Sequence, residues 1–195
     1  MMKPDEDRRV ARTRDALKKA FVDLLLSKGY AAISVHDIAE RANVGRSTFY
    51  MHFKSREDLL HACLARPSTP LADLVDGAAP ETLEPLLAHF KEQRRRNRAI
   101  FESPARETWV KHLAGLIELR LPRVRGAKPL LPAPLVAQHL AQTQISLICN
   151  WLFVWHQVGA VEFARALAAV TQAELAALLG PARYAASAAT ADGSS

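Results

Sequence analysis

Hydrophobic residues recur at helical spacing along most of this chain, and no segment shows a sustained alternation of apolar and polar positions. The first periodic segment ends naturally at Gly29, because glycine readily adopts the left-handed conformation that closes many helices. Its apolar face consists of Val10, Leu17, Phe21, Leu24 and Leu25. The pattern predicts a long first helix and, together with the later segments, an all-α protein.

Two short helices should follow the first. Ser34 and Asp37 have the spacing of a capping box, in which side chains and backbone N–H groups pair across the first turn of a helix. This pair predicts a second helix over about residues 35–42. Asn43 fits the turn after it, because asparagine tolerates a left-handed backbone better than most residues.

The stretch NVGRSTFYMHFKSRED, residues 43–58, combines buried-type aromatic residues with many hydrogen-bonding side chains. A third helix should begin at Gly45 or Arg46 and end at Phe53, and Ser55 with Asp58 should open a fourth that ends before Pro67. Two short helices joined by a tight turn form a helix-turn-helix when they cross closely. If the aromatic face points inward, the polar side chains must point outward; these are Arg46, Ser47 and Tyr50, with Thr48 at the edge.

Residues 8–66 resemble the DNA-binding domain of the TetR family of bacterial transcriptional regulators. The resemblance rests on Gly29–Tyr30 followed in order by SVHDIAERANV, STFYMHF and KSREDLL. Asn43 stands where the family usually has Gly, Gly45 where a capping Ser is common, and Arg56 where the family has Lys. The resemblance implies an N-terminal three-helix domain with a helix-turn-helix, followed by a C-terminal helical bundle for ligand binding and dimerisation.

The same resemblance implies which residues contact DNA. Ser34, Thr48 and Tyr50 would hydrogen-bond phosphates, and Lys54 with Arg56 would flank the DNA backbone, contacts that set position and not sequence. Arg46 and Ser47 are the candidates for reading base edges in the major groove. A basic arm could reach an adjacent groove, lie along phosphates or form a solvated helix face; it comprises Arg8, Arg9, Arg12 and Arg14.

The chain is expected to divide at its proline-rich stretch, PSTPLADLVDGAAP. The predicted parts are the DNA-binding domain (1–66), a linker (67–80), a helical ligand-binding and dimerisation domain (81–180) and a disordered tail (181–195). Within the third part we expect a helix that ends or bends near Asn97, one after Pro104, a long one over Leu135–Gln157 and a last one over about Val161–Leu179.

No Asp, Glu, Lys or Arg occurs from Pro129 to Val161. A long helix without charge should be covered nearly all round, which indicates a dimer interface or a central position in the bundle. Members of the family typically dimerise through their last two helices, so the resemblance implies a homodimer on a palindromic DNA operator.

The resemblance also implies a pocket for a small-molecule effector in the bundle. Aromatic and polar residues of the expected helices are the candidates for its lining, although plain core is the favoured place for each one taken singly, because aromatic residues at helical spacing mostly pack. They are Phe90, Phe101, Trp109, Gln144, Asn150, Trp151 and Trp155, with His89 and His112 as further polar anchors. The cluster Arg94–Arg98 could attract an anion or form a solvated helix end.

The charge favours an anionic partner. The chain has 26 Lys and Arg against 20 Asp and Glu, and residues 1–66 hold 13 against 9, an excess of four. Cys63 and Cys149 do not form a disulfide framework or a metal motif, and the N-terminus lacks the apolar core of a signal peptide. The most apolar run, Ile145–Trp155, is too short to cross a bilayer. We therefore expect a cytoplasmic protein without cofactor, metal or membrane contact.

Two other classes of function stay open at this stage. A sequence-independent architectural DNA-binding protein would need only the basic charge. An all-α enzyme is the less favoured alternative, because the chain holds no nucleophile elbow, P-loop, zincin or dinucleotide motif. The favoured reading is a ligand-responsive transcriptional repressor and not an enzyme.

Overall fold

The computed structural model describes residues 4–124 and 129–179, and within those ranges it contains helices and no strand. The N-terminal helices are α1 (Pro4–Lys28), α2 (Val35–Arg41), α3 (Arg46–His52) and α4 (Arg56–Asp73). The later helices are α5 (Glu84–Glu92), α6 (Arg94–Phe101), α7 (Ala105–Glu118), α8 (Ala133–Phe153) and α9 (Ala160–Leu179). Short 3₁₀ turns occupy Tyr30–Ala32, Leu74–Asp76, Pro80–Leu83 and Leu121–Arg123. The all-α prediction is confirmed; the tail predicted at 181–195 lies outside the described residues.

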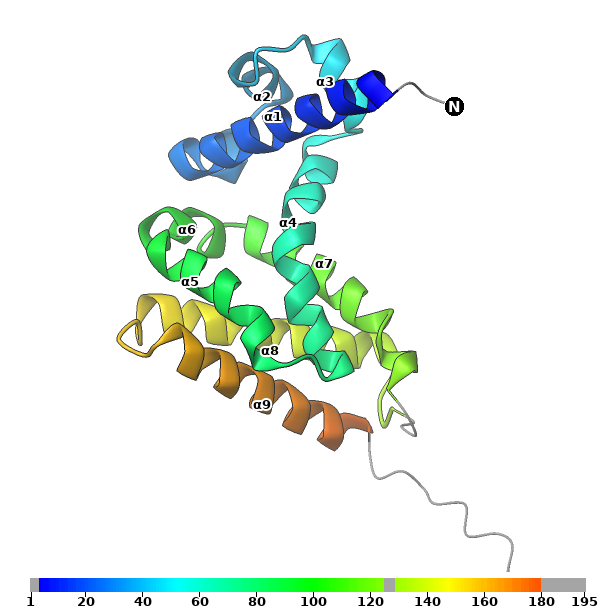
Figure 1. Ribbon diagram of the computed structural model, residues 1–195, viewed down its shortest axis with the longest axis vertical. Helices are drawn as coiled ribbons and strands as arrows, with labels where there is room; N and C mark the ends of the chain where they lie inside the picture. The colour runs from blue at the N-terminus through cyan, green and yellow to red at the C-terminus, as the bar shows by residue number, and fades with distance from the viewer. Residues whose placement is uncertain (1–3, 125–128, 180–195) are drawn as a thin grey trace, which may run out of the picture.

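The helices form two parts joined by α4 (Figure 1). In that view α1, α2 and α3 form the upper part, α4 runs downward from it, and α5 to α9 form the larger lower part. Helix α8 packs mainly on α7, and α7 in turn packs on α4. One continuous hydrophobic core runs through both parts, so α4 ties the small upper unit to the bundle.

The prediction that the fourth helix stops before Pro67 is wrong. Helix α4 continues to Asp73 with Pro67 and Pro70 inside it, and much of the expected linker is therefore helical. A proline inside a helix removes a backbone hydrogen bond and costs about 3 kcal/mol or more. Burial of the helix's second half offsets that cost, because Ser68, Leu71 and Ala72 are buried there and α4 packs against α7.

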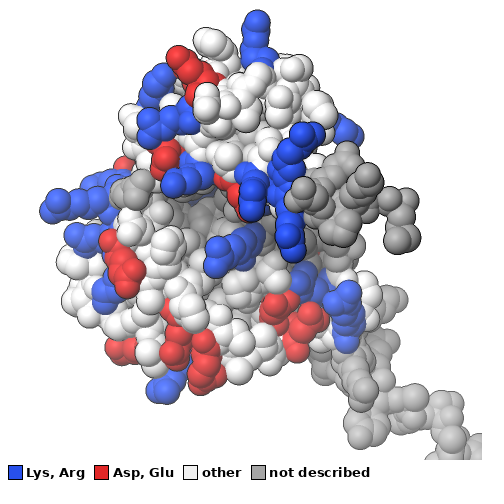
Figure 2. Space-filling model, turned by 45° about the horizontal axis from the view of Figure 1, so that its top comes forward, with Lys and Arg blue, Asp and Glu red and all other residues white. Residues whose placement is uncertain are grey.

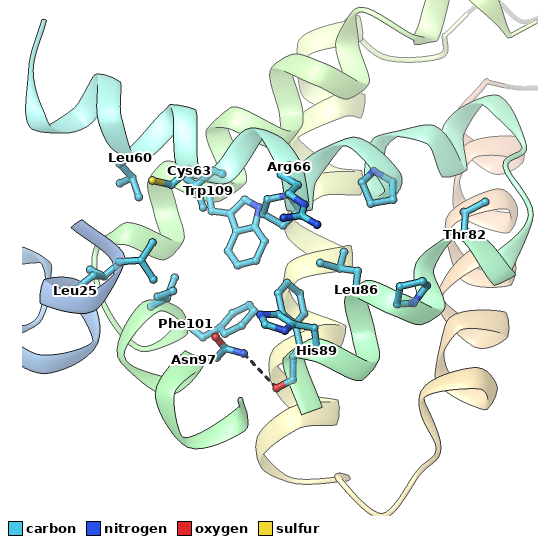
Figure 3. Close-up of a pocket in the computed structure, with 17 residues that line it drawn as sticks. Leu25, Leu60, Cys63, Arg66, Thr82, Leu86, His89, Asn97, Phe101 and Trp109 are labelled. Atoms are coloured by element: carbon cyan, nitrogen blue, oxygen red, sulfur yellow. Dashed lines mark hydrogen bonds between the residues drawn. The ribbon is translucent and has the colours of Figure 1, made fainter. Parts of the chain in front are cut away.

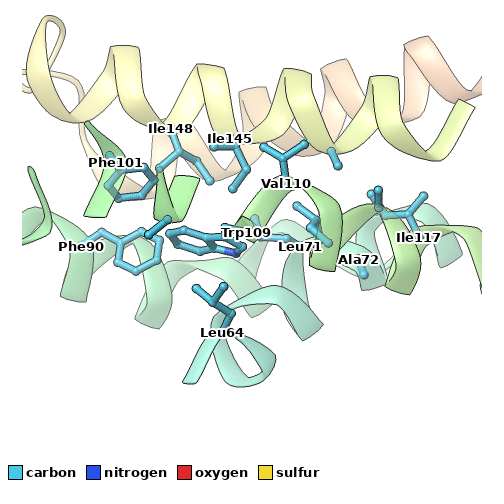
Figure 4. Packing of buried hydrophobic residues seen from close by; sticks show 14 of the residues in the cluster. Leu64, Leu71, Ala72, Phe90, Phe101, Trp109, Val110, Ile117, Ile145 and Ile148 are labelled. Carbon is cyan, nitrogen blue, oxygen red and sulfur yellow. The ribbon is translucent and has the colours of Figure 1, made fainter. Parts of the chain in front are cut away.

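Trp109 of α7 is the centre of this packing (Figure 4). Its ring lies between Leu64 and Ile145 in that view, and its Nε1–H donates a hydrogen bond to Ser68 Oγ at 2.9 Å. The indole N–H and the Ser68 hydroxyl are both buried, so each satisfies the other inside the core. This bond fixes α7 against the proline-containing half of α4.

Two other helix ends differ from the predictions. The break expected near Asn97 lies at Gln93, and Asn97 is inside α6, where its side-chain amide donates to the Phe90 carbonyl that the break leaves free. Helix α8 ends at Phe153 and not at Gln157. Among the described residues no helix is long and apolar enough to cross a membrane.

Candidate nucleic-acid interface

Helices α2 and α3 meet through a tight turn that the local sequence explains. Ser34 Oγ accepts the Asp37 N–H at 3.1 Å, and the Asp37 carboxylate accepts the Ser34 N–H at 2.8 Å, which completes the capping box. Asn43 takes a positive φ of 54° in the turn, as expected from its chemistry. Gly45 is the N-cap of α3 and, having no side chain, offers no capping bond.

Helix α3 is held down by its aromatic face. Phe49 is fully buried and Phe53, at the C-cap, is 2% exposed, and both belong to the core shared with α1 and α2. Arg14 of α1 closes this end: its guanidinium donates to the His52 carbonyl at 3.0 Å and lies 4.5 Å from the centre of the Phe53 ring. These contacts orient α3 rigidly on the body of the domain.

The opposite face of α3 is exposed and polar. Arg46 and Ser47 are exposed in the first turn, Thr48 is partly exposed, and Tyr50 is 58% exposed. None of these four side chains has a hydrogen-bond or ion-pair partner among residues 4–124 and 129–179. Sequence reasoning did not single out Met51, whose side chain is 80% exposed on this helix.

Arg56 has a structural place that the sequence did not indicate. Its Nη1 donates to the carbonyls of Tyr30 and Ile33, at 3.1 and 2.6 Å, and its guanidinium lies 4.3 Å from the centre of the Tyr30 ring. The side chain is 26% exposed. These bonds fasten the start of α4 to the turn after α1, so a role in DNA binding stays a prediction.

Ser34 precedes α2 and Lys54 follows α3, so the two residues stand before and after the helix-turn-helix in the sequence. Ser34 is exposed at the start of α2, although its hydroxyl is engaged with Asp37. Three hydrogen bonds from Ser34 and Lys28 hold the pKa of the Asp37 carboxyl well below its usual range. Lys54 is exposed between α3 and α4, and only its backbone N–H is bonded, to Asp58.

Basic groups are spread over the end of the molecule that carries α1 to α3. Figure 2 turns this end toward the viewer and shows Lys and Arg standing out over its upper and middle parts, with a few acidic groups among them and more acidic groups lower down. The polar side chains of α3 can hydrogen-bond to base edges in a DNA major groove, and the basic groups around the helix can pair with the negative phosphates.

Comparison with known proteins identifies the domain. Residues 19–63 match the family model described as bacterial regulatory proteins, tetR family. The first third of the chain is thus similar to the DNA-binding domain of TetR-family regulators. The curated relatives include the uncharacterised HTH-type transcriptional regulator YxbF of Bacillus subtilis, 46% identical over 68 residues, which are 34% of this chain and 18% of that relative.

A second sequence relative and two solved structures are similar to this chain over different lengths. The dhaKLM operon transcriptional activator DhaS of Lactococcus lactis is 46% identical over 48 residues, which are 25% of this chain and 26% of DhaS. These matches thus span well under half the length of either relative. Over the whole fold, a TetR transcriptional regulator from Streptococcus agalactiae is 25% identical with a TM-score of 0.56, covering 85% of this chain and 97% of the other. A TetR-family regulator from Streptomyces coelicolor shares the fold at 21% identity, with a TM-score of 0.60 over 90% of this chain and 98% of its own.

A cavity of about 550 Å³ lies between the DNA-binding part and the bundle. Helices α1, α4, α5, α6 and α7 all contribute to its wall (Figure 3). Of the residues expected to line a ligand pocket, His89, Phe90, Phe101 and Trp109 do so. Sequence reasoning missed Leu25, Cys63, Arg66 and Asn97, because only the folded chain brings α1 and α6 beside α4.

The other pocket candidates lie outside the wall of this cavity. Gln144 is buried between α4 and α9 and donates to Leu71 O and Thr171 Oγ1, both at 3.2 Å. Trp151 stacks on Phe163, with the ring centres 4.4 Å apart. Asn150 and Trp155 are exposed, and His112 faces His61 with 3.3 Å between their Nδ1 atoms. A ligand role for these residues stays a prediction, and no cluster of metal-binding side chains occurs within the described ranges.

Proposed function

We propose that this TetR-family protein is a sequence-specific regulator of transcription that acts as a homodimer on a palindromic operator, in the cytoplasm, and does not act as an enzyme. We further propose that it represses until a small-molecule effector binds. The observation that carries the proposal is the division of α3 into a buried aromatic face and an exposed face of unpartnered polar side chains.

The proposed division of labour on α3 follows from side-chain chemistry. Arg46 and Ser47, in the first turn, read base edges, and a bidentate Arg–guanine contact would contribute about 1–3 kcal/mol of discrimination. Tyr50 and Thr48 bind phosphates with their hydroxyls, while Ser34 and Lys54 add backbone contacts from either side. Met51, exposed beside Tyr50, suits an apolar contact with a thymine methyl group.

The faces of α8 and α9 that are left outside the core support a homodimer. Helix α8 exposes Leu135, Gln138, His139 and Gln142 and has no charged residue except histidine. Helix α9 exposes a stripe of small apolar side chains at helical spacing: Ala166, Ala169, Val170, Ala173 and Ala177. Small side chains let two helices approach closely, and a two-fold dimer would place two α3 helices about 34–36 Å apart, one turn of DNA.

The position of the cavity supports control by a ligand. Val22 and Leu25 of α1 form part of its wall together with residues of α4 to α7. A ligand in it would therefore touch the DNA-binding part and the bundle at once. Such a ligand shifts the balance between two domain arrangements only if it binds one of them more tightly.

Selection from a pool of random duplexes at near-physiological salt tests the function. Recovery of an inverted repeat with fixed half-site spacing is the expected result. Arg46→Ala should then lose affinity for the selected operator but not for random DNA, whereas an equal loss on both would contradict base reading. Recovery of no preferred sequence would favour the architectural DNA-binding alternative.

Repression is tested separately in a reporter strain. A promoter that overlaps the selected operator should be silenced by the protein and released by an effector. Increased transcription in the presence of the protein would instead show that it is an activator. The related DhaS is a transcriptional activator of the dhaKLM operon.

A further inference from the structure

We propose that the cavity between α1 and α7 binds a small apolar anion that also carries an N–H or O–H donor, with Arg66 pairing with the negative group and Asn97 Oδ1 accepting from the donor. This inference rests on the proposed function, because it names the chemical class of the effector at the same cavity.

The body of the ligand must be apolar. The cavity volume of about 550 Å³ is that of a site for a drug-sized molecule, and most of its wall is aliphatic or aromatic. Phe90, Phe101 and Trp109 form one edge, in which the Phe101 and Trp109 rings lie 5.1 Å apart at a tilt of 35°. A planar ring system would gain both burial and ring contacts against this edge.

Asn97 supplies a polar anchor of fixed direction. Its side chain is only 9% exposed, and its Nδ2 donates to the Phe90 carbonyl at 3.2 Å. Because that carbonyl needs a donor, the amide nitrogen must face it and the amide oxygen must face the other way. In Figure 3 the oxygen points away from the Phe90 bond, on the side facing Leu25.

The Asn97 oxygen has no hydrogen-bond partner among residues 4–124 and 129–179, yet the residue lines the cavity. The oxygen is open to solvent at the cavity, so a ligand that covers it without offering a donor would cost about 1–3 kcal/mol. A ligand that presents an N–H or O–H group to the oxygen would avoid that cost. The site therefore selects for ligands that carry a donor at that end.

Arg66 determines the preferred charge. Of the 17 residues that line the cavity, Arg66 is the one with a permanent charge, and no Asp or Glu is among them. Arg66 forms no salt bridge with any described residue, and Figure 3 shows its guanidinium beside Trp109, above Leu86 and His89. Arg66 is exposed to solvent while it lines the cavity. A carboxylate or sulfonate can pair with this fork of donors, whereas a cation beside it would meet a like charge.

Three matched fluorescent probes separate these contributions. The first, 2-anilinonaphthalene-6-sulfonate, has the apolar body, the N–H donor and the anion. N-phenyl-2-naphthylamine lacks only the sulfonate, and 2-(N-methylanilino)naphthalene-6-sulfonate lacks only the N–H. Dissociation constants for the full-length protein come from the increase in probe fluorescence on binding. The first probe should bind about tenfold more tightly than either of the others, a difference of about 1.4 kcal/mol.

Variants locate the probe. Arg66→Gln should weaken the first probe about tenfold and leave the neutral amine unchanged, while Arg95→Gln, an exposed arginine of α6 outside the cavity wall, should change neither. Asn97→Leu should remove the advantage of the N–H over the N-methyl probe. Because Asn97 also bonds to Phe90, circular dichroism must show that this variant folds, and the probe pair tests the donor without it.

Distinct outcomes would overturn distinct claims. Equal binding of the sulfonate and the neutral amine, or the same loss in Arg95→Gln as in Arg66→Gln, would overturn the preference for an anion while leaving the cavity as a ligand site. Absence of binding by all three probes would overturn the proposal entirely. Failure to select an operator from random duplexes would overturn the proposed function instead, whatever the probes do.

Discussion

Replacing Arg56 tests whether this arginine is a structural clamp. Its Nη1 joins two backbone carbonyls, and its guanidinium stacks on the Tyr30 ring, all between the start of α4 and the turn after α1. Hydrogen bonds from charged groups contribute about 1.5–3 kcal/mol, and a partly exposed cation–π contact adds about 0.5–1 kcal/mol. Since the side chain is 26% exposed and the contributions overlap, we expect Arg56→Ala to lower the free energy of unfolding by about 1.5–3 kcal/mol.

The assay is thermal and urea unfolding followed by circular dichroism. For a chain of this length each kcal/mol changes Tm by about 2–4 °C, so Arg56→Ala should melt roughly 3–12 °C lower than the natural sequence. Lys54→Ala is the matched control, because the Lys54 ammonium has no partner among the described residues and the change should stay within about 0.5 kcal/mol.

Arg56→Lys separates charge from geometry. Lysine keeps the positive charge but cannot reproduce the planar fork, so it should recover only part of the lost stability. If Arg56→Ala melts at the same temperature as Lys54→Ala, the clamp is refuted. If its only defect is weaker DNA binding in the folded state, Arg56 acts at the phosphates, as the sequence resemblance implies.

Four further predictions concern single groups. Phe49→Ala should destabilise the protein by about 3–5 kcal/mol in urea unfolding, whereas Met51→Ala on the exposed side of α3 should change stability little; similar losses would contradict the assigned faces. Tyr50→Phe should weaken operator binding in fluorescence anisotropy at unchanged Tm, because the exposed phenol has no partner among residues 4–124 and 129–179; unchanged affinity would exclude a phosphate bond. The pKa of Asp37 is lowered, so its contribution to stability is present above the unfolded pKa of about 3.9 and is lost as the pH falls below that value. The urea midpoint of Asp37→Asn should therefore depend less on pH between about 5 and 2.5 than that of the natural protein. Partial burial raises the pKa of the Cys63 thiol to about 12 and that of Cys149 to about 11, so both should react slowly with a thiol reagent at pH 8 until urea unfolds the chain; fast native labelling would contradict the raised pKa values.

Local interactions made the first domain predictable. The capping box at Ser34, the left-handed Asn43 and the third helix starting after Gly45 all appear in the structure close to their predicted places. Each depends on residues within about four positions of one another, which the sequence displays directly. The inward aromatic face of α3 follows from the same short-range spacing, and it fixes which polar side chains are exposed.

Long-range packing decided what the sequence could not show. Pro67 and Pro70 favour a helix end locally, but burial of α4 against α7 carries the helix through both. The place of Arg56 depends on the Tyr30 and Ile33 carbonyls, more than twenty positions earlier in the chain.

The cavity is a product of tertiary structure for the same reason. Leu25, Arg66 and Asn97 belong to three different helices, and no spacing in the sequence relates them. The sequence by itself thus determined that the chain is helical, the caps of α2 and α3 and the exposed face of α3, because these depend on neighbours along the chain. Which side chains surround the cavity was decided only by the tertiary structure, because helix packing sets distances that chain separation does not.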